Sequence, residues 1–121
     1  MLVRCTAYQD GRKLDDIVPD EIHNYVNRPE CFVWVALVDP GPGELAAMQH
    51  QFKLHELAVE DARHGHQRPK IEEYGDSVFV VLQTIEVEND ELRVGEIDVF
   101  VGPNYVLSVR NDSKKGLTEV R

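Results

Sequence analysis

Two adjacent acids, Glu60 and Asp61, have the clearest chemical potential in this sequence because of where a helix would place them. The segment Phe52–Asp76 begins with a helical pattern, and a helical wheel started at Leu54 gathers an apolar arc of Leu54, Leu57, Ala58 and Ala62. Glu60 falls outside this arc, whereas Asp61 falls near its middle. A carboxylate there must be hydrogen-bonded, paired, protonated or metal-bound, because burying an unpaired charge is very costly.

Two interpretations of Asp61 are open at this point. In the first, Asp61 forms a structural pair with a basic residue just downstream, Arg68 or Lys70, or a hydrogen bond to loop backbone. In the second, Asp61 is a ligand or interface carboxylate that faces another element or another subunit. Spacing alone favours the structural pair, since buried acids are almost always paired.

Other reactive residues do not make an active site. Glu60 and His64 are four apart, but a zinc enzyme needs three well-placed ligands, and His55-Glu56 lacks the second histidine of H-E-x-x-H. Adjacent side chains point about 100° apart on a helix, so Glu60 and Asp61 form no acid–base dyad. No serine lies in a G-x-S-x-G turn, and neither cysteine has a histidine nearby in sequence. We therefore expect no enzymatic activity.

The composition indicates one globular domain over residues 1–121. Twenty-two acidic and 13 basic side chains give a net charge of −9, which argues against nucleic-acid binding because phosphate recognition needs basic patches. No apolar run approaches the ~18 residues that a membrane-spanning helix needs. Cys5 and Cys31 lie in strand-like runs without metal-ligand spacing, so we expect two reduced core thiols in a cytosolic protein.

The helix that carries the two acids is expected to end abruptly. Gly65 suits the left-handed residue just past a helix end. Pro69 disfavours a helical conformation at the residue before it, so the chain from Arg68 to Tyr74 should be extended. Gly75-Asp76 then predicts a turn before a second apolar strand.

Three strands are expected to follow as a meander, separated by turns at 88–90 and 102–104. The middle strand alternates in character. One face carries Ile97, Val99 and Val101, and the other carries Glu96 and Asp98.

The N-terminal half supplies the remaining elements. Asp10-Gly11 predicts a tight hairpin, and Pro19 opens a short helix. The unbroken apolar run Cys31–Val38 predicts a central strand covered on both faces, with Trp34 in the core. A helix follows over Glu44–Phe52. The fold class is therefore α/β, an α/β/α sandwich with a mixed, largely antiparallel central sheet of about six to seven strands and helices on both faces.

Three motifs carry a family resemblance. F-x-L-H-E-L-A-V-E-D-A, then H-Q-R-P-K-I-E-E-Y-G-D, and later N-Y-V-L-S-V-R resemble the N-terminal cytoplasmic domain of the CorA family of divalent-cation (magnesium/cobalt) transporters. The resemblance implies a regulatory divalent-ion site between neighbouring subunits that controls gating. Asp61 matches the ligand position, with Glu60 a weaker candidate. The partner carboxylate in the family comes from a later helix of the adjacent subunit, which is absent here.

The resemblance also implies the ions and the partners. Mg²⁺ is the expected ion, bound weakly or not at all by the isolated domain, and Co²⁺ or Zn²⁺ are alternatives. Other copies of the same chain are expected partners, with a pentamer for the full-length protein. The location implied is the cytoplasmic face of the cell membrane, reached only through C-terminal membrane helices absent from this sequence.

Two alternative functions are kept. One is a domain of a zinc-transporting relative in the same family, and the other is a stand-alone cytosolic ligand- or protein-binding module. The helical pattern that starts at Gly116 stops after one turn at Arg121, which favours an excised piece over a stand-alone module.

Overall fold

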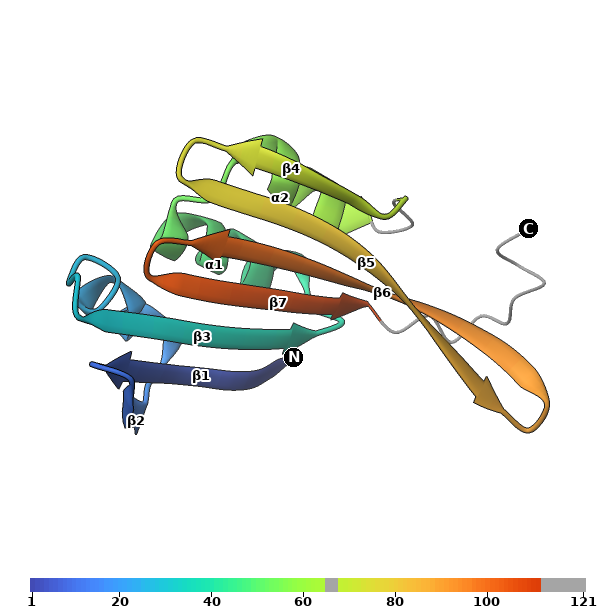
Figure 1. Ribbon diagram of the computed structural model, residues 1–121, viewed down its shortest axis with the longest axis horizontal. Helices are drawn as coiled ribbons and strands as arrows, with labels where there is room; N and C mark the ends of the chain where they lie inside the picture. Colours follow the sequence, from blue (N-terminus) through green and yellow to red (C-terminus); the bar gives the residue numbers. More distant parts are fainter. Residues whose placement is uncertain (65–67, 112–121) are drawn as a thin grey trace.

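A computed structural model describes residues 1–64 and 68–111, without the side chain of residue 93. These residues form a single seven-stranded sheet with helices packed against it (Figure 1). In chain order, the elements are β1 (Leu2–Gln9), β2 (Arg12–Asp16), the 3₁₀ helix η1 (Pro19–Asn24), β3 (Cys31–Val38), α1 (Pro42–Phe52), α2 (Glu56–His64), β4 (Lys70–Tyr74), β5 (Ser77–Glu88), β6 (Glu91–Gly102) and β7 (Tyr105–Asn111).

The strand order is β2-β1-β3-β7-β6-β5-β4. Within this sheet β3 and β7 are parallel, with Val35 opposite Leu107, and the other neighbouring strands are antiparallel. The parallel pair joins the N-terminal hairpin to the predicted β5–β6–β7 meander. The expectation of an α/β fold with a mixed, largely antiparallel sheet of six to seven strands is therefore confirmed.

The described helices lie on one face of the sheet, where α1 packs between η1 and α2 (Figure 1). Helices were expected on both faces, and this part of the prediction is wrong for the described residues. Burial along β3 alternates, with Val33 and Val35 fully buried but Phe32 and Trp34 37% and 39% exposed. The prediction of Trp34 in the core is also wrong. Its ring lies beneath the Arg4 guanidinium, 4.6 Å from the ring centroid.

The core lies between the helices and the sheet. Its sheet side presents alternate residues of β3, β5, β6 and β7, and its helix side presents mainly aliphatic residues of α1 and α2. Two aromatic contacts close the end near the β6–β7 turn, with ring centroids 4.8 Å apart for Phe79–Phe100 and 4.4 Å for Phe52–Tyr105. This packing fixes which side chains of β4 and β6 face α2.

The predicted turns follow from local backbone requirements. Asp10 and Gly11 have φ values of 51° and 80° in the β1–β2 turn, and Gly75 has 61° in the β4–β5 turn. These left-handed conformations favour Gly and Asp. The extended segment after Pro69 is confirmed as β4. The predicted left-handed residue Gly65 and the helical pattern predicted from Gly116 to Arg121 lie outside the described residues.

Both cysteines are buried and form no disulfide, as expected. Burial raises the pKa of the Cys5 thiol to about 11, and the nearby carboxylates of Glu21 and Asp16 add to that effect. A thiol with this pKa is protonated at neutral pH and is a poor nucleophile. Across residues 1–64 and 68–111, the structure contains no helix with the length and apolar character to cross a membrane.

Candidate metal site and the charged layer beneath helix α2

Helix α2 is anchored at its start by His55. The His55 Nδ1 atom accepts a hydrogen bond from the Leu57 N–H at 3.1 Å, which satisfies one of the free amides of the first turn. The His55 ring stacks on Tyr74 with centroids 4.2 Å apart, which ties α2 to β4. Basic residues in the last turn, Arg63 and His64, suit the negative end of the helix dipole.

The buried face of α2 differs from the wheel expectation. Ala58, Val59 and Ala62 are buried, whereas Leu57 is 58% exposed. The helix begins at Glu56, so Leu54 precedes it and does not share its wheel. Asp61 consequently lies at the edge of the buried face rather than in its middle.

Asp61 is paired within its own chain. Lys70 Nζ donates to Asp61 Oδ2 at 2.7 Å and lies 2.9 Å from Glu72 Oε1. The three side chains are 29%, 30% and 38% exposed in the order Asp61, Lys70, Glu72, so solvent reaches this network. Hydrogen bonds to Asp61 and then to Glu72 hold the pKa of Lys70 above its usual range. The structural pair with Lys70 is therefore confirmed.

Glu60 does not join this network. Its Oε1 lies 3.6 Å from His64 Nε2 at the exposed surface of α2, with a side chain 58% exposed. The two adjacent acids thus have different partners, as expected for neighbouring helical positions. Metal binding by Asp61 and Glu60 stays a prediction. Among residues 1–64 and 68–111, no three His, Cys, Asp or Glu side chains are arranged to hold a metal ion.

Two acids that the sequence did not single out lie beneath α2. Asp98 is fully buried and Glu96 is 7% exposed, and both face the helices from β6. The pKa of Asp98 is raised to about 8. Burial is the largest cause, and repulsion from the charge of Glu96 and a hydrogen bond with Glu96 add to it. Alternation along β6 was visible in the sequence, but nothing in it indicated that the acidic face turns inward.

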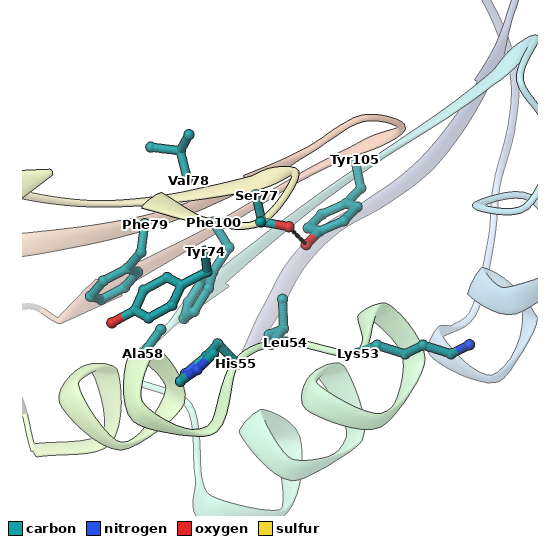
Figure 2. Close-up of a pocket in the computed structure, with 11 residues that line it drawn as sticks. Lys53, Leu54, His55, Ala58, Tyr74, Ser77, Val78, Phe79, Phe100 and Tyr105 are labelled. Atoms are coloured by element: carbon teal, nitrogen blue, oxygen red, sulfur yellow. Dashed lines mark hydrogen bonds between the residues drawn. The ribbon is translucent and has the colours of Figure 1, made fainter. Parts of the chain in front are cut away.

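A cavity of about 440 Å³ opens beside this layer, between the α1–α2 junction and the β4–β5 turn (Figure 2). Its walls are mainly apolar, and the hydroxyl groups of Ser77 and Tyr105 lie 3.3 Å apart across its upper side. Of the described residues that line it, none carries a carboxylate. The described lining therefore offers Mg²⁺ no carboxylate ligand.

Comparisons with known proteins agree with this fold. Residues 29–121 match the family model of the CorA-like Mg2+ transporter protein. The chain is 29% identical over 121 residues to the YfjQ protein of Bacillus subtilis (strain 168), whose name refers to metal ion transport. That match covers 99% of this chain and 36% of YfjQ, so the chain spans about a third of this relative.

Solved structures show the same fold. The complete CorA magnesium transporter of Methanocaldococcus jannaschii superposes with a TM-score of 0.64 at 17% identity, over 94% of this chain and 34% of that one. The soluble domain of the same transporter gives 0.60 at 17% identity, over 93% and 43%. The full-length CmaX protein gives 0.72 at 19% identity, over 94% and 36%. Because the family model matches more than half of the sequence, the chain belongs to the CorA-like Mg²⁺ transporter family.

Proposed function

We propose that this chain is the cytoplasmic regulatory domain of a CorA-like magnesium or cobalt transporter. In this proposal Asp61 contributes a carboxylate to a divalent-ion site between neighbouring copies, and Glu60 is a secondary candidate. Membership of the family supports the transporter assignment. The position of Asp61 supports the site, because its carboxylate is partly exposed at the edge of α2.

The contacts of Lys70 are the observation that carries the proposal. Lys70 touches both Asp61 and Glu72. When an ion binds Asp61, Lys70 can stay paired with Glu72, so ion binding need not leave the partly buried ammonium of Lys70 without a partner. Mg²⁺ keeps several waters and needs only one or two carboxylates, which a partly exposed edge can provide.

The proposed mechanism is ion-linked gating. An ion that bridges Asp61 and a carboxylate of the neighbouring copy stabilises one arrangement of subunits, and without the ion the facing acids repel each other. A single copy supplies only the Asp61 carboxylate in this proposal, and Lys70 competes for it. It should therefore bind Mg²⁺ weakly.

The proposed assembly is a homo-oligomer, a pentamer in the full-length protein, at the cytoplasmic face of the cell membrane. Co²⁺ and Zn²⁺ are tested beside Mg²⁺, because a zinc-transporting relative would share the same fold. Preference for Zn²⁺ over Mg²⁺ in both affinity and transport would favour that alternative. If the chain is instead a stand-alone binding module, none of these three ions should change its assembly or support transport.

The test is a Mg²⁺ titration followed by NMR on the wild type, Asp61→Asn and a control, Glu73→Gln. Glu73 is an exposed acid of β4, next to Glu72 and on the opposite face of the strand, so its variant removes the same charge. We expect shifts centred on Asp61 that are lost only in Asp61→Asn. In the full-length transporter, Asp61→Asn should weaken the Mg²⁺ dependence of gating. Unchanged Mg²⁺ dependence in that variant would refute the role of Asp61.

A further inference from the structure

Glu96 and Asp98 are two residues apart on β6 and point to the same, helix-facing side of the sheet. Asp98 is fully buried, and Glu96 is nearly so. The established fold needs no acid at either position, since the next residue on this face is the core residue Phe100. The pair is therefore a buried polar feature that packing alone does not explain.

The Asp98 carboxyl group has no conventional donor. Within the part of the chain that the structure describes, neither of its oxygens accepts a hydrogen bond from an N–H group or a Ser, Thr or Tyr hydroxyl, so the carboxyl group of Glu96 is left as its hydrogen-bond partner. A buried carboxylate without donors loses its hydration and gains no hydrogen bonds to replace it, so its charged form is strongly disfavoured. Two carboxyl groups can satisfy each other only when one of them carries a proton.

The neighbouring elements decide the charge around Asp98. Across the sheet, Asp98 stands level with Val81 of β5 and Val109 of β7, which are apolar. Beyond Val81, the next residue in the same row is Lys70 of β4.

The charged groups near Asp98 are unevenly balanced. Glu96 and Asp61 act on Asp98 as negative charges and Lys70 of β4 acts on it as a positive charge, while Asp61 and Glu72 both contact Lys70. Lys70 is therefore already engaged by two partly exposed carboxylates. The fully buried Asp98 is left without a donor for its charged form, and a proton removes that charge.

We propose that Asp98 and Glu96 form a proton-binding site, in which one proton is shared between the two carboxyl groups at neutral pH. Release of this proton to solvent leaves two adjacent carboxylates beneath α2. Lys70 is then drawn toward Asp98 and away from Asp61, because it is the positive charge in the same row of the sheet. The occupancy of the site therefore sets how firmly Lys70 holds Asp61.

Electrostatics agree with this geometry. The pKa of Asp98 is raised to about 8, first by burial, then by the charge of Glu96 and the hydrogen bond with it, and then by Asp61. Lys70 acts in the opposite direction and lowers the pKa of Asp98. Three charged groups near Asp98, namely Glu96, Asp61 and Lys70, thus govern its protonation.

The test is a carboxyl-detected ¹³C NMR titration of the chain from pH 4 to 10, in the presence of a chelator so that only protons compete. The Asp98 resonance is assigned by its loss in Asp98→Asn. We expect an Asp98 midpoint above pH 7. The Lys70 Cε resonance should shift through the same midpoint in the wild type and lose that transition in Asp98→Asn. A midpoint below pH 5, or a Lys70 resonance that ignores the Asp98 transition, would overturn the proposal.

Two variants test whether the proton is shared. Glu96→Gln removes a like charge and supplies an amide donor, so the Asp98 midpoint should fall by at least about one pH unit. Glu73→Gln, on the exposed face of β4, should leave the midpoint unchanged. Equal midpoints in wild type and Glu96→Gln would refute sharing. Because the readouts contain no metal ion, their outcome is independent of the proposed divalent-ion site.

Discussion

The pH dependence of stability should be dominated above pH 5 by Asp98. Its folded-state pKa of about 8 lies above its ordinary value of 3.8, so the folded protein binds more protons than the unfolded chain between these values. The free energy of unfolding therefore falls as the pH rises from about 4 to about 8, and it levels off above about 8. An acid stabilised by a salt bridge has the opposite effect, because the free energy of unfolding then rises with pH.

The magnitude follows from the two pKa values. The interval between 3.8 and about 8 corresponds to at most about 6 kcal/mol, since one pKa unit is about 1.4 kcal/mol. The pKa of about 8 already includes the effect of Lys70, and the part of the interval above pH 5 corresponds to at most about 4 kcal/mol, so we expect a change of about 2–4 kcal/mol between pH 5 and pH 9. Asp98→Asn keeps the shape of the side chain, cannot ionise and can donate to Glu96. It should match the wild type at pH 5 and exceed it by about 2–4 kcal/mol at pH 9.

The assay is urea denaturation followed by circular dichroism at pH 5, 7 and 9. The comparison requires equal m-values, the slopes of the free energy of unfolding against urea concentration. Glu73→Gln serves as the control, because it removes an exposed acid of the same sheet and should parallel the wild type. A constant difference between Asp98→Asn and wild type at all three pH values would refute the reasoning. That result would mean that Asp98 is charged in the folded protein throughout.

Three further substitutions test the packing and the ion network. Lys70→Met removes the cation that competes with Mg²⁺ for the Asp61 carboxylate. The Mg²⁺ affinity of the chain, measured by NMR titration, should therefore rise at least about fivefold. An unchanged affinity would show that Lys70 does not compete. Leu107→Ala empties a fully buried site on β7 and should cost about 3 kcal/mol in urea denaturation, against less than about 1 kcal/mol for Leu57→Ala at an exposed site. Gly102→Ala would place a Cβ against the Tyr105 ring and should cost about 2 kcal/mol. Most of that cost should disappear in the background of Tyr105→Ala, and full additivity of the two changes would argue against the clash.

The local features of the fold were predictable because their causes are local. The β1–β2 turn needs left-handed backbone at Asp10 and Gly11, and the β4–β5 turn needs it at Gly75. The β5–β6–β7 meander likewise follows from turn residues between β-branched runs. Residue types within three or four positions of one another carry this information.

The rotation of α2 about its axis was not predictable from the wheel. Lys53 adopts a left-handed conformation with φ of 56°, and the new helix begins only at Glu56. Leu54 therefore packs from the linker, Leu57 turns outward, and Val59, which the wheel left outside the apolar arc, is buried. The wheel drawn across this break placed Ala58 and Ala62 correctly on the buried face, but it wrongly put Leu57 inside and Asp61 near the middle of that face.

The sequence by itself determined the strands, the turns, the mixed sheet and the candidate pair of Asp61 with a downstream base. Only the tertiary structure decided that Lys70 is that base and that Glu96 and Asp98 face inward. Alternation defines two faces of a strand, but the face that meets helices is set by connections far along the chain. For β6 those connections placed α2 over the acidic face, and the charge beneath this helix is the result.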